Sequence, residues 1–146
     1  MNIDRPKLET ELDKKREHIA LRYLERHYNW HGVELIFNRY KIDWAFFENN
    51  RAGAPLTAWG EFKYRSKKFA SYLISSDKYA KMVDLQNTSG VPAYLFIKYQ
   101  EEDFIWQHQV RWELLQKLTL GGSPKTNEFE PVVTIPHSEF ESIAFK

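Results

Sequence analysis

The stretch LTAWGEFKYR, residues Leu56 to Arg65, decides how the chain arranges its polar groups. Its aromatic and β-branched residues follow a turn-forming segment and predict a β-strand. Side chains two positions apart on a strand point to the same face of the sheet. Glu61 and Lys63 therefore share one face of this strand, and Phe62 between them points to the other.

A second strand is predicted directly before it, over YKIDWAFFE, residues Tyr40 to Glu48. The turn at 49–55 between the two strands makes them antiparallel neighbours. Asp43 lies in this second strand, where almost every other side chain is apolar. A lone buried carboxylate is costly unless it is paired or bound to a metal ion. We therefore expect Asp43 to meet Glu61 and Lys63 at one point.

Two carboxylates and an ammonium group at one point could hold a divalent cation and a phosphate. Mg²⁺ takes oxygen ligands and needs only one or two carboxylates, and the ligands here would be Asp43, Glu61 and the backbone carbonyl of Phe62. A bound metal activates water and stabilises charge on a phosphate, and Lys63 would orient that water or neutralise the developing charge. The alternative is a structural salt bridge from Lys63 to Asp43 or Glu61.

The segment from about residue 9 to 28 has helical periodicity, with apolar residues recurring at three- and four-residue spacings. Glu17 falls inside the apolar arc of this helix, so its carboxylate needs a partner. That partner would be the metal site or, as an equally good alternative, an Arg or Lys at the helix interface.

The remaining elements follow from periodicity and turn signals, while 67–75 is ambiguous. Asp77 or Ser76 would cap a second helix over 77–88, and Gly90 would end it. Gly121-Gly122-Ser123-Pro124 is predicted to be a loop. The other predicted elements are strands over 33–38, 93–99, 104–110 and 132–135, and a short helix within 110–118. The order is helix, three strands, helix, strand and further β elements, which indicates an α/β fold around a mixed sheet flanked by helices.

The composition sets outer limits on the class of protein. The 146 residues suit a single domain, with a core over about 9–110 and a C-terminal extension over 111–146. There is no Cys, which excludes disulfides and cysteine-ligated metal. No apolar run approaches the roughly 20 residues of a membrane span, and the charged N-terminus lacks a signal-peptide pattern. We therefore expect a cytoplasmic protein without a membrane partner.

The net charge of +1 does not by itself indicate a nucleic-acid partner. An enzyme that binds one short stretch of DNA needs only a local cluster of cations. Basic residues do cluster directly after the Glu61–Lys63 segment. A solvated surface is the simpler explanation for any single one of them. The candidate DNA-contacting residues are Arg65, Lys67, Lys68, Lys78 and Lys81.

These motifs resemble those of the PD-(D/E)XK nuclease superfamily, whose restriction-endonuclease-like core is a helix, three strands, a helix and a strand. Asp43 matches the motif Asp and Glu61-Phe62-Lys63 matches ExK, although Ile42 replaces the proline. Glu17 matches a first-helix Glu of Holliday-junction-resolvase-like members, and the chain is similar to small nuclease-like proteins of phages and bacteria. The resemblance implies Mg²⁺- or Mn²⁺-dependent cleavage of DNA phosphodiester bonds, and nothing about which DNA is cut.

The leading hypothesis is therefore a metal-dependent DNA endonuclease in recombination, repair or phage DNA processing, with structure-specific cleavage as one of the options that the sequence leaves open. Its place would be the cytoplasm of a bacterium or a phage-infected cell. Two alternatives remain: a non-catalytic nucleic-acid-binding module on the same fold, and a protein-interaction subunit. The sequence does not decide between a monomer, which would cut one DNA strand, and a homodimer, which could cut both.

Overall fold

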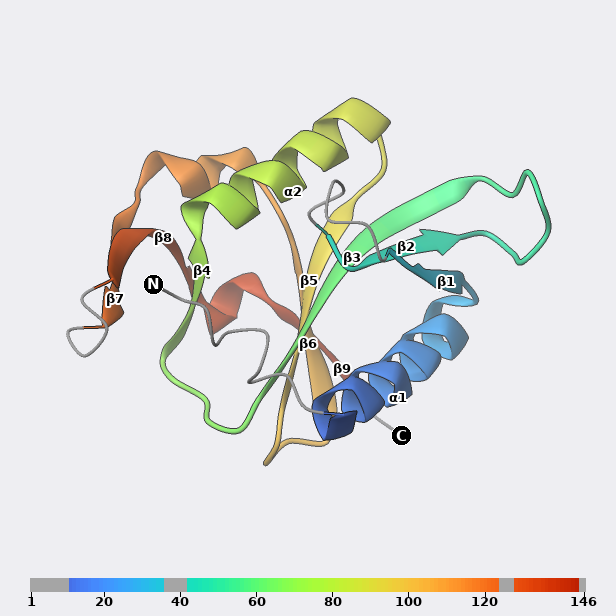
Figure 1. Ribbon diagram of the computed structural model, residues 1–146, viewed down its shortest axis with the longest axis horizontal. Coiled ribbons are helices and arrows are strands. Elements are labelled where there is room, and N and C mark those ends of the chain that lie inside the picture. Colours follow the sequence, from blue (N-terminus) through green and yellow to red (C-terminus); the bar gives the residue numbers. More distant parts are fainter. Residues whose placement is uncertain (1–10, 36–41, 124–127, 145–146) are drawn as a thin grey trace.

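The computed structural model describes residues 11–35, 42–123 and 128–144 (Figure 1). The elements are α1 (Glu11–Tyr28), β1 (His31–Glu34), β2 (Trp44–Phe47), β3 (Leu56–Arg65), β4 (Ser71–Ser75), α2 (Ser76–Ser89), β5 (Ala93–Tyr99), β6 (Phe104–Gln109), the 3₁₀ helix η3 (Trp112–Gln116), β7 (Thr119–Ser123), β8 (Glu128–Pro136), the 3₁₀ helix η4 (His137–Glu139) and β9 (Glu141–Ala144).

The strands form a six-stranded sheet, in the order β1-β2-β3-β5-β6-β9, and a three-stranded sheet, in the order β4-β8-β7. In the larger sheet β3 and β5 are parallel, whereas every other neighbouring pair is antiparallel. The crossover between the parallel strands contains α2, as parallel strands require. The expected α/β fold around a mixed sheet is confirmed.

The two long helices cover opposite faces of the main sheet (Figure 1). Alternate residues of β5 separate the two cores, because Leu95 and Ile97 pack with α2 whereas Phe96 packs with α1. The small sheet adds buried side chains to the α2 side. None of the described helices is long and apolar enough to cross a membrane.

The register of β2 and β3 brings the candidate residues together. Trp44 is paired with Gly60 in this antiparallel ladder, so Asp43, one residue before β2, continues the register toward Glu61. Trp44 packs on the α1 side of the sheet, and alternation therefore directs Asp43 to the α2 side, the face of Glu61 and Lys63. The expected antiparallel pairing of these strands is confirmed.

The predicted loop at Gly121-Gly122-Ser123-Pro124 is wrong for its first three residues, which belong to β7. Gly121 pairs with Glu130 of β8, and a Cβ atom at this position would come within 2.4 Å of the Cγ1 atom of Val132, two residues further along that strand. Glycine therefore marks a close approach between neighbouring strands here rather than a turn. Pro124 lies outside the described residues.

Other element boundaries also differ from the sequence predictions. The cap of α2 is Ser75, whose hydroxyl accepts a hydrogen bond from the Lys78 backbone, rather than Ser76 or Asp77. The strand predicted over 132–135 spans Glu128–Pro136, and β9 follows it and joins the main sheet beside β6. The segment 111–146 thus contributes a strand to the main sheet. Residues 36–41, part of two predicted strands, lie outside the described residues.

Candidate active site

Glu61 is a buried carboxylate held between two lysines. Its side chain is only 2% exposed, and its Oε2 atom lies 3.2 Å from the Lys63 Nζ atom. Its Oε1 atom lies 2.9 Å from the Lys78 Nζ atom, although this contact lacks hydrogen-bond geometry and Oε1 accepts no hydrogen bond among the described residues. The two lysines compensate much of the cost of burying the charge, and the Oε1 atom keeps its hydrogen-bonding capacity.

Lys78 reaches this point because α2 begins directly after β4. The residue lies in the first turn of the helix, next to the fully buried Tyr79 and four positions before the fully buried Met82. Residues three and four apart share a helix face, so Lys78 lies at the edge of the face that packs on the sheet. Its ammonium group consequently contacts Glu61.

Asp43 provides the second carboxylate of the site. Burial, followed by the nearby charge of Glu61, raises the pKa of Asp43 to about 7, and Glu17 adds to the rise while Lys63 and Lys78 oppose it. Among the described residues, no hydrogen bond or ion pair is made by the Asp43 carboxyl group. The folded protein thus holds a partly buried acid whose charge is disfavoured.

Lys63 keeps its charge in these surroundings. Burial lowers the pKa of its ammonium group, but Glu61 and Asp43 outweigh burial, and the net pKa is raised. The side chain is 34% exposed, so the ammonium group extends from the buried carboxylate toward solvent. Phe62 lies between the two motif residues on β3, and its side chain is buried on the α1 side.

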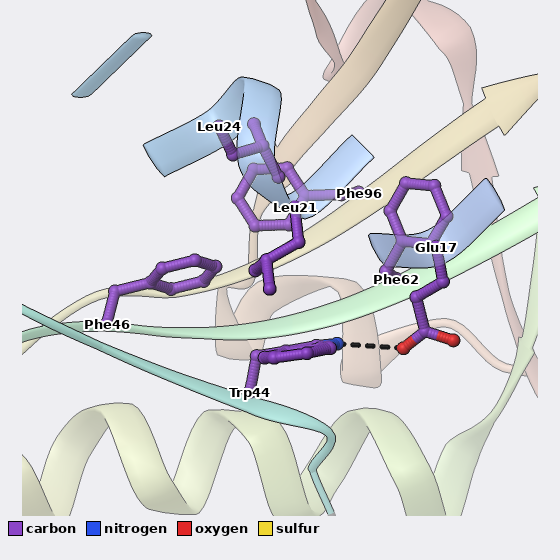
Figure 2. A pocket seen from close by; sticks show the side chains of 7 residues that line it. All are labelled: Glu17, Leu21, Leu24, Trp44, Phe46, Phe62 and Phe96. Atoms are coloured by element: carbon purple, nitrogen blue, oxygen red, sulfur yellow. Dashed lines mark hydrogen bonds between the residues drawn. The ribbon is translucent and has the colours of Figure 1, made fainter. Parts of the chain in front are cut away.

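Glu17 approaches the site from α1, on the other face of the sheet. Its Oε1 atom accepts a hydrogen bond of 2.8 Å from the Trp44 indole nitrogen, at one end of a narrow apolar crevice under the helix (Figure 2). This half-buried acid thus has an indole partner that neither sequence explanation included. Its charge still contributes to the raised pKa of Asp43, which places the carboxylate near the site.

The donor set suits a divalent cation of the Mg²⁺ type. Asp43 and Glu61 supply carboxylate oxygens, which are the ligands that Mg²⁺ prefers, and one or two carboxylates suffice. The disfavoured charge of Asp43 and the Glu61 Oε1 atom without a hydrogen bond are both features that a cation would relieve. No group of three or more His, Asp or Glu side chains within the described ranges is arranged to hold a metal ion. Water would therefore complete the coordination.

The five candidate DNA-contacting cations divide into three groups. Lys78 belongs to the site itself. Lys68 pairs with Glu102, and Lys81 pairs with the exposed Asp77 one helical turn away. In the part of the chain that the structure describes, Arg65 and Lys67 have no carboxylate partner; both line a pocket at the end of β3.

Sequence reasoning placed Lys78 among the surface cations and missed its contact with Glu61. The signal was present in the helical spacing of Lys78 and Met82, which puts the lysine beside the buried face of α2. Tyr72 was also missed, although it lies close enough to Lys63 to help raise its pKa. No pattern in the sequence links Tyr72 to Lys63, because β4 was not recognised as a strand.

Comparisons with known proteins identify the family of the chain and its fold. A family model described as "Phage putative PDDEXK endonuclease" matches residues 3–143. The fold is similar to that of the Holliday junction resolvase Hjc from Archaeoglobus fulgidus, solved at 1.6 Å resolution, with a TM-score of 0.54 and 12% sequence identity over 88% of this chain and 95% of that chain. A search of curated proteins gave no match. The likeness to the resolvase confirms a restriction-endonuclease-like fold.

Proposed function

The chain belongs to this phage PDDEXK endonuclease family, and we propose that it is a divalent-metal-dependent DNA endonuclease whose catalytic residues are Asp43, Glu61 and Lys63. The observation that carries the proposal is the state of Asp43. An acid with a pKa near 7, beside a second carboxylate and a lysine, is typical of a functional site rather than of a structural ion pair.

The salt bridge between Glu61 and Lys63, which the alternative hypothesis expected, is present. It does not explain Asp43, whose carboxyl group remains outside any ion pair among the described residues. A purely structural role would favour an apolar or amide side chain at this position, because burying an uncompensated carboxylate costs stability. The arrangement is therefore better suited to chemistry than to folding.

In the proposed site Asp43, Glu61 and the carbonyl of Phe62 would hold Mg²⁺, or Mn²⁺ in its place. Glu17, whose Oε1 atom accepts the Trp44 indole hydrogen bond on the other face of the sheet, would act on the ion only through its charge or through a bound water. When bound, the ion would supply an activated water and charge stabilisation on the scissile phosphate. Lys63 remains protonated at neutral pH because Glu61 and Asp43 raise its pKa. Its partly exposed ammonium group is then placed to neutralise negative charge that develops on the phosphate.

Lys78 is proposed to position Glu61. Its contact with Oε1 leaves the other carboxylate oxygen to Lys63, so the two lysines fix the orientation of a side chain that supplies a metal ligand. Groups that orient a metal ligand in this way contribute strongly to metal sites. Lys78 is therefore assigned to the site rather than to the phosphates of distant nucleotides.

DNA contacts outside the site are assigned first to Arg65 and Lys67, which have no carboxylate partner among the described residues. Lys68 and Lys81 are weaker candidates, because DNA would have to compete with Glu102 and Asp77 for them. We infer a role in phage or bacterial DNA processing, recombination or repair, in the cytoplasm. The similar fold of a Holliday junction resolvase makes a four-way junction a substrate to test, and a homodimer would be able to cut both strands.

The test is a cleavage assay of the purified protein on supercoiled, linear duplex, single-stranded and four-way-junction DNA, each with Mg²⁺, Mn²⁺ or EDTA. Cutting that requires the metal ion is the expected result, and the ranking of substrates would define the biological role. If the folded protein binds DNA but cuts none of these substrates, the function is that of a binding module. If it neither binds nor cuts, a protein-interaction role would replace the proposal.

A further inference from the structure

A pocket of about 250 Å³ opens beside the candidate active site, where β3 ends and β4 begins. Arg65 and Lys67 line it together with the aromatic rings of Phe69 and Tyr72 and the side chain of Leu73. Sites for small molecules usually measure about 300–1,000 Å³. This pocket is slightly smaller and would suit one planar ring system rather than an extended ligand.

The pocket adjoins the residues assigned to cleavage. Arg65 follows Lys63 by two positions on β3, on the same face of the strand, which corresponds to about 7 Å along the strand. Tyr72 connects the two places, because it lines the pocket and also contributes to the raised pKa of Lys63. A ligand in the pocket would therefore lie about one nucleotide away from the proposed scissile phosphate.

The surface of the pocket combines exposed apolar groups with available positive charge. Phe69 is 64% exposed and Leu73 is 53% exposed, so two neighbouring lining residues present apolar surface to solvent. The Lys67 Nζ atom lies 5.2 Å from the centre of the Phe69 ring, and the Arg65 guanidinium lies 5.8 Å from that of Tyr72. Neither cation has a carboxylate partner among the described residues. Aromatic rings beside cations that no carboxylate neutralises are complementary to a base and its phosphates, although a phosphate would replace the contact of Arg65 with the Tyr72 hydroxyl.

We propose that this pocket holds one unstacked base of the DNA strand next to the cleaved phosphodiester, with the base against Phe69 and with Arg65 and Lys67 on the neighbouring phosphates. The inference rests on the proposed function and narrows it to DNA with unpaired nucleotides beside the cut. In an intact duplex the base faces are covered by neighbouring pairs, and exposing one costs a few kcal/mol. Single-stranded or branched DNA would fill the pocket without that cost.

The experiment measures equilibrium binding by fluorescence anisotropy in EDTA, which keeps binding separate from cleavage. The probes are a fluorescein-labelled single-stranded oligonucleotide and a fully paired duplex of the same sequence. The wild type should prefer the single strand. Phe69→Ala should weaken single-strand binding about 30-fold, the middle of the range for one aromatic–base stack, and duplex binding less than twofold.

Phe129→Ala is the matched control, because Phe129 is also half exposed but lies on β8 outside the pocket. It should leave both affinities unchanged. A thermal melt of each variant checks folding. Arg65→Gln removes the positive charge and keeps a polar side chain. It should weaken the binding of both probes and lower the salt dependence of binding by the equivalent of about one phosphate contact.

The proposal is overturned if Phe69→Ala binds the single strand as tightly as the wild type, or if it weakens both probes equally. If the wild type nevertheless cuts DNA, the base pocket is ruled out but the proposed nuclease function stands. Conversely, the wild type could cut no DNA while Phe69→Ala selectively loses single-strand binding. That result would support the proposed base pocket and overturn the proposed nuclease function. If the folded wild type binds neither probe, both proposals fail.

Discussion

Two buried polar clusters in this molecule have opposite properties. In the first, the Tyr79 hydroxyl lies 2.8 Å from the His108 Nε2 atom and accepts a hydrogen bond from the Arg111 backbone, while the His108 Nδ1 atom lies 2.9 Å from the Glu139 carbonyl oxygen. A carbonyl oxygen can only accept, so the proton is on Nδ1 and Nε2 accepts from Tyr79. Burial lowers the pKa of His108 and keeps the ring neutral. Each of these groups has a partner.

The second cluster, around Asp43 and Glu61, is crowded with charge and incompletely satisfied. Asp43 is disfavoured as an anion, and the Glu61 Oε1 atom accepts no hydrogen bond among the described residues. Satisfied networks stabilise a fold, whereas buried groups left unsatisfied call for another explanation, such as catalysis or an ion. The contrast supports the proposal that the first cluster is structural and the second functional.

The largest expected effect is on cleavage by Asp43→Asn. The substitution keeps the shape of the side chain but removes the charge proposed to hold the metal ion, so single-turnover cleavage should fall at least about 100-fold. Asp77→Asn, at an exposed acid on α2, is the control and should cut normally. Equal rates for the wild type and Asp43→Asn would remove Asp43 from the site.

A substitution in the first cluster, around Tyr79 and His108, should lower the stability of the protein rather than its cleavage activity. Tyr79→Phe leaves the His108 Nε2 atom and the Arg111 amide without their partner, which should lower the free energy of unfolding by about 2 kcal/mol. Urea unfolding measures this change. The variant should still cut DNA at close to the wild-type rate under conditions where it is folded. A large loss of cleavage without a loss of stability would contradict the division between the clusters.

The pH dependence of stability should also distinguish the clusters. The folded-state pKa of Asp43, about 7, is raised above its ordinary value of 3.8, so the folded protein binds this proton more tightly than the unfolded chain does. Without metal, the stability contributed by this group should fall as pH rises from about 4 through 7, by about 2–3 kcal/mol between pH 5 and pH 8. His108 contributes a slope of the opposite sign, because its pKa is lowered.

Urea unfolding of the wild type and Asp43→Asn in EDTA at pH 5 and pH 8 separates these contributions, since only Asp43 differs between the two proteins. The variant should gain stability relative to the wild type as pH rises. If the free energies of unfolding of the two proteins differ by the same amount at both pH values, the charge of Asp43 is not disfavoured in the folded protein.

The smallest effect is expected from the two lysines of α2. Lys78→Met removes one of the two cations that flank the buried Glu61 and should cost about 1 kcal/mol of stability. Lys81→Met breaks an exposed pair with Asp77, one helical turn away, and should cost about 0.5 kcal/mol or less. Thermal melts in EDTA compare them. An equal cost for both would indicate that the contact between Lys78 and Glu61 contributes nothing to stability.

Sequence reasoning was most successful where the physical signals are local. Clear turns bound Leu56–Arg65 and Ala93–Tyr99, and both strands have the predicted bounds. Alternation along a strand predicted that Glu61 and Lys63 share a face, and the hairpin between the strands predicted that Asp43 meets them. These conclusions need only the two-residue period of a strand and one short connection.

The remaining features depend on contacts between distant segments. Gly121 is part of a strand because of Val132 across the sheet, and Lys78 reaches Glu61 because α2 begins directly after β4. The four residues of β9 are too few to show a period and are held by pairing with β6. The pocket at Phe69 likewise requires β4 to be placed beside the end of β3, which no local pattern predicts.

The central claim is tested most directly by Lys63→Ala on supercoiled DNA with Mg²⁺, beside the wild type and Lys81→Ala. The account predicts that the wild type and Lys81→Ala convert the DNA to nicked or linear forms, that EDTA stops both, and that Lys63→Ala cuts at least about 100-fold more slowly while still binding DNA. Cutting by Lys63→Ala at the wild-type rate would contradict the account.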